Sequence, residues 1–256
     1  MKGLRSRPKP RRRLGQNFLK AQWAIGEFAK WACRFRKVVE IGAGTGAITS
    51  RAGDCHSVEV LAALEVDGSL IPELSSVSFF NMKVVVIHSD ATRPPLRMNG
   101  FDSAYGSIPY SITGPLLSLL AKHFQKPALL LLQREVARRL ASQPGSEGYG
   151  RITVIVRAVY DVRLGRVVPP SAFYPRPKVF SQFVELAPRR SVSPDVLERL
   201  EELTRCFFSQ RRRKAIKVAP KCLKKISLDD VAEIFGERRV YEIPPETFLE
   251  LASSSG

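Results

Sequence analysis

The chain has 256 residues, of which 44% are hydrophobic, and its formal net charge is +17. This length allows one sizeable core and a smaller appended domain. No apolar run approaches the roughly 20 residues of a membrane span, and the basic N-terminus has no apolar stretch after it. We therefore expect neither a membrane protein nor a secreted one, and we expect a cytoplasmic location.

The excess positive charge is confined to two segments. Residues 1–20 hold eight Lys or Arg side chains and residues 205–225 hold nine, with no acidic side chain in either. Because such dense like charge repels itself, an anionic partner is expected, and nucleic acid is the natural candidate. We predict a basic N-terminal arm over residues 1–20, with nucleic-acid contacts that include Arg11, Arg12 and Arg13.

The four cysteines are scattered along the chain, at Cys33, Cys55, Cys206 and Cys222. They form no CxxC pair and have no histidine cluster beside them. This spacing predicts reduced, mostly buried thiols rather than a disulfide framework or a zinc site, so no metal is expected.

Helix-like and strand-like segments alternate between about residues 20 and 140. Amphipathic or apolar patterns predict helices over residues 22–32 and 115–124. Short apolar runs alternating with helices indicate βαβ units and a parallel sheet that helices cover on both faces. The strands are expected at residues 37–41, 60–65, 83–87, 102–106 and 128–133.

The pattern changes in the second half of the chain. Residues 151–160 and 179–186 are β-rich and are interpreted as antiparallel strands added at one edge of the sheet. We predict an α/β fold, a Rossmann-like and mostly parallel sheet over residues 21–188, followed by a small all-helical C-terminal domain over residues 189–256. The helices of that domain are expected at residues 194–207, 211–218, 228–235 and 246–252.

Ligand-binding features follow three successive strands. The first strand enters the turn Gly42-Ala-Gly-Thr-Gly46, whose glycines let a ligand approach the backbone closely. Glu65 ends the second strand, where a carboxylate can accept both ribose hydroxyls of NAD or of S-adenosylmethionine. Asp90 follows the third strand and can reach an adenine amino group, an arrangement common in methyltransferases. The combination predicts an S-adenosylmethionine site that includes Gly42, Gly44, Glu65 and Asp90.

The fourth strand ends in Gly106-Ser-Ile-Pro-Tyr110, which is similar to the (Asp/Asn/Ser)-X-Pro-(Tyr/Phe) signature of amino-group methyltransferases. An exocyclic amine of adenine is a poor nucleophile, and acceptors on its N–H groups localise the nitrogen lone pair. The Ser107 hydroxyl and the Ile108 carbonyl are the candidate acceptors, while Pro109 fixes the backbone. Tyr110 offers a face on which the base can stack. Alignment, rather than a strong base, would supply much of the rate.

Taken together, these motifs resemble the ribosomal RNA adenine N6,N6-dimethyltransferase family, in particular its KsgA-type small-subunit dimethyladenosine transferases, with the erythromycin-resistance methylases as relatives. The resemblance covers nearly the whole chain. It is carried by residues 14–19 (LGQNFL), 39–46, 133–140 (QREVARRL), 149–153, 169–181 (PPSAFYPRPKVFS) and 208–214 (FSQRRRK).

The resemblance implies a class I methyltransferase domain whose product is N6,N6-dimethyladenosine at two adjacent adenosines near the 3′ end of small-subunit rRNA. The substrate would be an immature ribosomal subunit, and the enzyme a monomer. Phe173 would form the second wall of an adenine sandwich with Tyr110. The implied cofactor contacts are Asn17, Leu19, Gly42, Glu65, Asp90 and Ser107, and the implied RNA contacts are Lys178, Arg211, Arg212, Arg213 and Lys214.

One departure from the family pattern leaves alternatives open. Ser107 stands where the family usually has Asn; serine still accepts a hydrogen bond, but its shorter side chain puts the rate and extent of dimethylation in doubt. The main alternative is an RNA-binding ribosome assembly factor with weak or vestigial methyltransferase activity. A large-subunit rRNA target and an NAD oxidoreductase are further alternatives, and nothing in the sequence resembles a hydride-transfer site.

Overall fold

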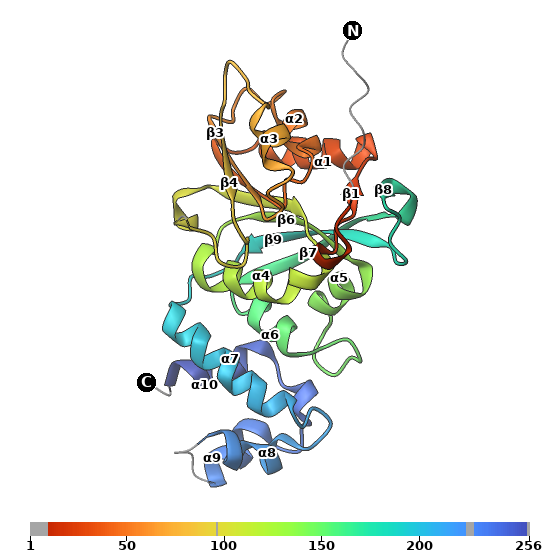
Figure 1. The fold of residues 1–256 in the computed structure, drawn as a ribbon. Helices are drawn as coiled ribbons and strands as arrows, with labels where there is room; N and C mark the ends of the chain where they lie inside the picture. The colour runs from red at the N-terminus through yellow and green to blue at the C-terminus, as the bar shows by residue number, and fades with distance from the viewer. Residues whose placement is uncertain (1–9, 96, 224–227, 255–256) are drawn as a thin grey trace. The chain divides into compact units, whose positions relative to one another are not determined.

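The structure is a computed structural model that describes residues 10–95, 97–223 and 228–254 (Figure 1). Residues 1–9 of the predicted basic arm lie outside the described residues, as do Lys224 and Lys225 of the second basic segment and the side chain of Arg12. Among the helices that the structure describes, none is long and apolar enough to cross a membrane.

The chain divides into two compact units, each built from separated stretches of sequence. The first unit comprises residues 1–116, 126–134 and 165–185, and the second comprises residues 117–125, 135–164 and 186–256. The chain passes from the first unit to the second for the last time at residue 185, close to the boundary expected near residue 188. The assignment of separate functions to residues 21–188 and 189–256 stays a prediction.

A seven-stranded sheet with the strand order β4-β3-β2-β5-β6-β9-β7 confirms the predicted Rossmann-like fold. Strands β4, β3, β2, β5 and β6 pair in parallel, and each lies within one residue of its predicted bounds. The strands are β1 (Phe18–Leu19), β2 (Lys37–Ile41), β3 (Val60–Glu65), β4 (Lys83–His88), β5 (Ser103–Ser107), β6 (Ala128–Gln133), β7 (Tyr160–Val168), β8 (Phe173–Tyr174) and β9 (Ser181–Pro188).

Helices flank the sheet of the first unit. Helix α1 confirms the helix predicted over residues 22–32, and its Phe28 packs against Tyr105 of β5, with ring centroids 6.0 Å apart. Strands β1 and β8 form a separate antiparallel pair, visible side by side in Figure 1, which the sequence did not predict. The helical segments are η1 (Arg12–Leu14), α1 (Gln22–Ala32), α2 (Ala47–Ala52), α3 (Ile71–Ser75), η2 (Met98–Gly100), η3 (Tyr110–Ile112), α4 (Thr113–Leu119) and η5 (Pro170–Ala172).

The second unit is mainly helical. Helix α7 begins where the Ser193 hydroxyl accepts a hydrogen bond from the Val196 N–H, with Pro194 at the first helical position. Its buried face includes Phe207, whose ring lies 5.5 Å from those of Phe235 and Phe248. The helical segments are η4 (Leu120–Phe124), α5 (Arg134–Leu140), α6 (Arg151–Arg157), α7 (Pro194–Phe208), α8 (Ala215–Cys222), α9 (Leu228–Phe235), η6 (Val240–Glu242) and α10 (Pro245–Ser254).

The strand predicted over residues 151–160 is wrong, because residues 151–157 form helix α6 and β7 begins only at Tyr160. The β-branched run Ile-Thr-Val-Ile-Val favours a strand locally. A contact with a distant residue favours the helix over the strand. The Thr153 hydroxyl accepts a hydrogen bond from the Gly150 N–H and donates one to the Arg139 carbonyl at 2.8 Å, which fixes the first turn of the helix.

The helix predicted over residues 211–218 begins later, at Ala215, and ends at Cys222. The preceding residues pair with a distant segment instead. The N–H groups of Tyr241 and Val240 donate to the carbonyls of Arg211 and Arg213, at 3.2 and 3.0 Å. The basic cluster therefore lies on a turn-rich loop before the helix rather than in its first turn.

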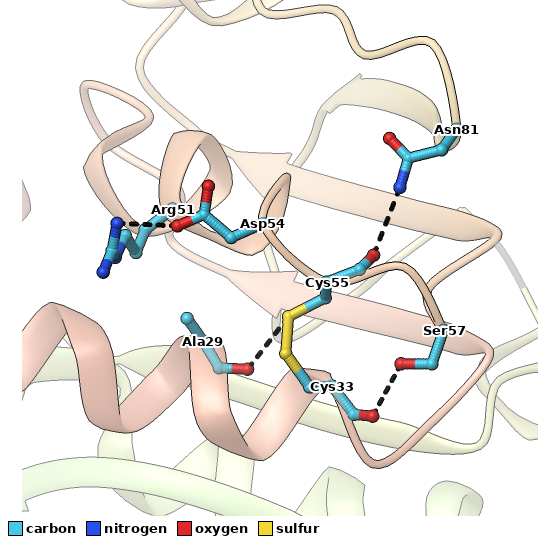
Figure 2. The surroundings of a disulfide bond; sticks show 7 residues. All are labelled: Ala29, Cys33, Arg51, Asp54, Cys55, Ser57 and Asn81. Carbon is cyan, nitrogen blue, oxygen red and sulfur yellow. Dashed lines mark hydrogen bonds and ion pairs between the residues drawn. A yellow bond between two sulfur atoms is a disulfide. The ribbon is translucent and has the colours of Figure 1, made fainter.

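The prediction of four reduced thiols is also wrong, because the structure has two disulfides and no free cysteine among the described residues. Cys33 directly follows α1, and Figure 2 shows it bonded to Cys55, which follows α2. Ser57 donates to the Cys33 carbonyl at 2.6 Å and so holds one side of this bridge in place. The second disulfide joins Cys206 of α7 to Cys222 of α8. Sequence spacing could not show these pairs, since the fold brings the Cα atoms within 4.9 and 5.7 Å.

The disulfides predict a measurable loss of stability on their removal. The bridges span 22 and 16 residues of sequence. Because each restricts the unfolded chain, replacing either pair with alanines should lower the free energy of unfolding by about 3 kcal/mol, measured by urea denaturation. Alkylation of the unfolded, unreduced protein should label no cysteine, whereas prior reduction should expose all four. Four labelled thiols without reduction would contradict the assignment.

Candidate active site

The glycine turn after β2 has the backbone conformation that the motif predicts. Gly42, Gly44 and Gly46 have φ values of 69°, 57° and 77°, in the left-handed region that favours glycine. The N–H groups of Gly42 and Ala43 donate to the Leu64 carbonyl at 2.9 and 3.0 Å, which ties the turn to the end of β3. The turn is thus a preorganised cradle of backbone at the carboxyl end of the sheet.

Glu65 is fixed beside this turn at the end of β3, and only 5% of its surface is exposed. One carboxylate oxygen accepts the Gly44 N–H and the other accepts the Asp67 N–H, both at 2.8 Å. Asp90 follows β4 on the neighbouring strand and is exposed, and its carboxylate accepts from the N–H and the hydroxyl of Thr92. Both carboxylates lie where the sequence placed them, and their cofactor contacts stay predictions.

The Ser107–Tyr110 stretch meets the glycine turn. A Cβ atom on Gly42 would lie 3.6 Å from the Pro109 ring and 3.8 Å from the Ser107 carbonyl oxygen. The Ile108 N–H donates to the Leu131 carbonyl at 3.1 Å, which anchors the stretch to β6. The residues predicted for cofactor binding and for chemistry therefore come together at one edge of the sheet.

Tyr110 is half-buried, and its hydroxyl lies 3.0 Å from the hydroxyl of Ser181, the first residue of β9. Burial raises the pKa of this phenol above its ordinary value, although the hydrogen bond with Ser181 opposes the shift. The side chain is thus neutral at physiological pH, and the Ser181 hydroxyl fixes the position of its phenol oxygen. Ser181 was not identified from the sequence as a partner of the site.

Phe173 lies in the core of the first unit, with 2% of its surface exposed. It pairs with Leu19 across the β1–β8 ladder. An adenine can stack on this ring only if the ring becomes accessible, so its role as the second wall of a sandwich stays a prediction. The next residue, Tyr174, is 42% exposed.

The N-terminal motif folds against the same edge of the sheet. Asp67 is 1% exposed, and its carboxylate receives hydrogen bonds from Gln16 and Ser69 and an ion pair from Arg11 at 3.2 Å. Although burial opposes ionisation, these contacts hold the pKa of Asp67 below its usual range. Gln16 and Asp67 were missed from the sequence, because the contact joins positions 51 residues apart.

The predicted cofactor contacts Asn17 and Leu19 have different surroundings. The Asn17 side chain is partly buried and donates to the Gly15 carbonyl at 3.1 Å, whereas Leu19 is buried in β1. Phe18, between them, lies beside the glycine turn: a Cβ atom on Gly44 would be 3.3 Å from its ring. This places the motif next to the cofactor turn.

The basic cluster of the second unit divides into two groups by its contacts. Arg211 donates to the carbonyls of Tyr149, Ser146 and Glu147, and its guanidinium lies 4.9 Å from the Tyr241 ring centroid. Lys214 forms an ion pair with Glu237. These contacts already engage both side chains, and their role in RNA binding stays a prediction.

Arg212 and Arg213 are exposed beside an open hollow of about 490 Å³, which residues 208–213 line. Arg11 faces Asp67, while Arg13 and Lys178 are exposed.

Glu40 is a buried ionisable residue that the sequence analysis did not single out. It lies in β2, directly before the glycine turn, and accepts a hydrogen bond from the Thr49 hydroxyl at 2.7 Å. Burial raises the pKa of Glu40 to about 8, against the opposing hydrogen bond from Thr49. A lone acidic residue within the apolar run Val-Val-Glu-Ile was the available signal.

The raised pKa of Glu40 predicts a pH-dependent stability. The folded protein keeps this proton up to about pH 8, whereas the unfolded chain releases it near the ordinary value of 4.5. The stabilising contribution is thus present below pH 4.5 and is lost as the pH rises to 8, by up to about 1.4 kcal/mol per pH unit. Glu40→Gln should remove this loss. Urea denaturation of both proteins between pH 5 and 8 would contradict the assignment if their difference stayed constant.

Comparisons with known proteins identify the family of the chain. The family of ribosomal RNA adenine dimethylases matches residues 7–254. A probable ribosomal RNA small subunit methyltransferase A from Pyrobaculum aerophilum is 37% identical over 94% of this chain and 96% of its own length. The ribosomal RNA small subunit methyltransferase A of Legionella pneumophila is 32% identical, over 96% and 98%.

A solved structure supports the fold. The crystal structure of a dimethyladenosine transferase from Plasmodium falciparum superposes with a TM-score of 0.76, at 24% identity, over 91% of this chain and 95% of that one. At that identity the likeness concerns the fold alone, whereas the sequence matches extend over nearly the whole chain. The chain therefore belongs to the ribosomal RNA adenine dimethylase family.

Proposed function

We propose that the protein transfers methyl groups from S-adenosylmethionine to N6 of two adjacent adenosines near the 3′ end of small-subunit rRNA, giving N6,N6-dimethyladenosine. The substrate would be an immature ribosomal subunit, and the enzyme would act as a monomer. The observation that carries the proposal is the close approach of Gly42 to the Ser107 carbonyl oxygen and the Pro109 ring. It joins a cofactor cradle to an amine-binding stretch at one edge of the sheet.

The choice of small-subunit rRNA rests on the relatives. Those at 37% and 32% identity are named as small-subunit methyltransferases, and they share nearly the full length of this chain. The segment at residues 208–214 favours the same branch. A large-subunit target is therefore the weaker candidate.

The residues at the strand ends fit an adenosine-containing cofactor. The backbone of Gly42 and Gly44 leaves no side chain in the way, and Glu65 is held with one carboxylate oxygen on the Gly44 N–H. Asp90 would hold the adenine amino group, and Asn17 and Leu19 would close the site from the N-terminal motif. When bound, S-adenosylmethionine supplies a methyl group on a positively charged sulfur.

The residues at the end of β5 orient the acceptor. The Ser107 hydroxyl and the Ile108 carbonyl accept hydrogen bonds from the adenine amino group, and so localise its lone pair toward the donor. Pro109 fixes the direction of that carbonyl. Tyr110 provides a stacking face whose position the Ser181 hydroxyl sets. Phe173 is proposed as the second wall, after movement out of the core.

RNA binding involves both units. Arg13 and Lys178 in the first unit, and Arg212 and Arg213 in the second, are exposed and contact phosphates in this proposal. Arg211 holds the loop at residues 146–149, so it positions its exposed neighbours. Contacts with phosphate provide affinity rather than base selection.

The product can be identified directly. Undermethylated small ribosomal subunits are incubated with the protein and S-adenosylmethionine, and their rRNA is digested to nucleosides for mass spectrometry. We expect N6,N6-dimethyladenosine in amounts that depend on the protein. Stable binding to the subunits without any methylated adenosine would instead support the assembly-factor alternative.

Ser107 provides a sharper test of the mechanism. Ser107→Ala removes one acceptor for the amino group and should lower the single-turnover rate of methyl transfer about 10- to 1000-fold, or roughly 1.4–4 kcal/mol. Ser107→Asn, which restores the usual family residue, should retain activity. Ser76→Ala, an exposed position in the same unit, is the matched control. An unchanged rate in Ser107→Ala would exclude this hydroxyl from the mechanism.

A further inference from the structure

A tryptophan and an arginine form an exposed stack on the first unit. Trp23, in the first turn of α1, is 37% exposed, and the Arg166 guanidinium of β7 lies 4.3 Å from its ring centroid. The same indole contacts Phe183 of β9 edge-on, with centroids 6.5 Å apart. Phe183 thus packs against the Trp23 ring from the core, and Arg166 covers the ring on the solvent side.

The surroundings of this stack are both basic and apolar. Residues 162–184 contain four Lys or Arg side chains and no acidic one. Six of the eight large hydrophobic residues exposed in the described chain lie in this region. They are Trp23, Leu164, Val167, Tyr174, Val179 and Phe180. Positive charge interleaved with exposed aromatic rings is typical of surfaces that bind single-stranded nucleic acid.

The stack is joined to the reaction site through one strand. Phe183, beneath Trp23, and Ser181, whose hydroxyl contacts Tyr110, are two residues apart in β9. Alternate residues of a strand face the same side and lie about 7 Å apart. A nucleic-acid strand whose target base reaches Tyr110 therefore passes close to Trp23 and Arg166.

We propose that Trp23 and Arg166 form a binding subsite for an unpaired nucleotide of the RNA strand that carries the target adenosine. The inference rests on the proposed function, since it assigns a neighbour of the methylated base. A base stacks on the free face of the guanidinium, as bases do on arginine planes in other RNA complexes. The remaining N–H groups of Arg166 face the adjacent phosphate.

A purely structural role for the pair makes a different prediction. β7 ends the strand order of the sheet, and charged side chains on such an edge discourage pairing with other chains. In that case, removal of Arg166 would affect solubility and leave RNA affinity unchanged. The two roles can therefore be separated by measuring binding.

The test compares two arginine–tryptophan pairs whose tryptophans both lie in α1. Arg34 is exposed and lies 4.4 Å from the ring centroid of Trp31, at the far end of α1. Arg166→Ala and Arg34→Ala therefore remove the same charge and the same type of contact. Fluorescence anisotropy with a labelled 20-nucleotide unpaired RNA containing two adjacent adenosines gives the dissociation constant. We expect an increase of about 5- to 50-fold for Arg166→Ala and less than about twofold for Arg34→Ala.

The tryptophan itself supplies a second measurement. RNA should quench the emission of the native protein and protect it from acrylamide, because a base stacked on Arg166 shields the indole on the other side of the guanidinium. Trp23→Phe, which keeps a ring over Phe183, should lose most of this response while its melting temperature stays close to that of the native protein. Unchanged affinity in Arg166→Ala, or an equal loss in both arginine variants, would overturn the subsite.

These outcomes are distinct from a failure of the proposed function. If the native protein binds RNA through Arg166 but forms no methylated adenosine, the function is wrong and the subsite stands. If methyl transfer proceeds and Arg166→Ala matches Arg34→Ala, the subsite alone is wrong. Binding of S-adenosylmethionine, measured by calorimetry, should be the same in all three variants.

Discussion

The close approach of β5 to the end of β2 is the constraint on which the candidate site depends. A Cβ atom on Gly106 would lie 2.2 Å from the Ile41 carbonyl oxygen, a separation that no side chain permits. Because the clashing atom belongs to the backbone of a central strand, it cannot move without disturbing the sheet. Glycine at 106 therefore lets Ser107 leave β5 directly beside Gly42. Any larger residue would separate the Ser107–Tyr110 stretch from the glycine turn.

The strand order explains why ligand-binding residues gather at this edge. From β2 the chain adds β3 and then β4 on one side, and later adds β5 and β6 on the other. Open α/β sheets bind ligands where this direction reverses, outside the carboxyl ends of the strands. Gly42 and Ser107 stand on either side of the reversal, with Glu65 one strand further out. The topology thus places residues that lie 65 positions apart in sequence around a single site.

The parts of the fold predicted from the sequence were those with local signals. Buried parallel strands have continuous apolar runs, so β2, β3 and β6 were found at their exact ends, and the glycine motif gave the position of the turn after β2. The failures all involve contacts over long separations. Residues 151–157 have the β-branched composition of a strand, yet the Arg139 carbonyl holds Thr153 in a helix. The disulfides, the Gln16–Asp67 contact and the burial of Phe173 likewise depend on how distant segments fold together.

The positive charge has a structural as well as a recognition role. Arg11 neutralises the buried carboxylate of Asp67. Arg211 donates hydrogen bonds to three backbone carbonyls of the loop at residues 146–149. Arginine suits this use because one rigid side chain carries five donors and stays charged. The net charge of +17 therefore overstates the number of cations available to phosphate. Arg212 and Arg213 in the second unit, and Lys178 and Arg166 in the first, are exposed and are the cations proposed to contact phosphate. Where a neighbouring ring holds such a cation in place, as Trp23 does for Arg166, less side-chain entropy is lost on binding than for an unsupported side chain.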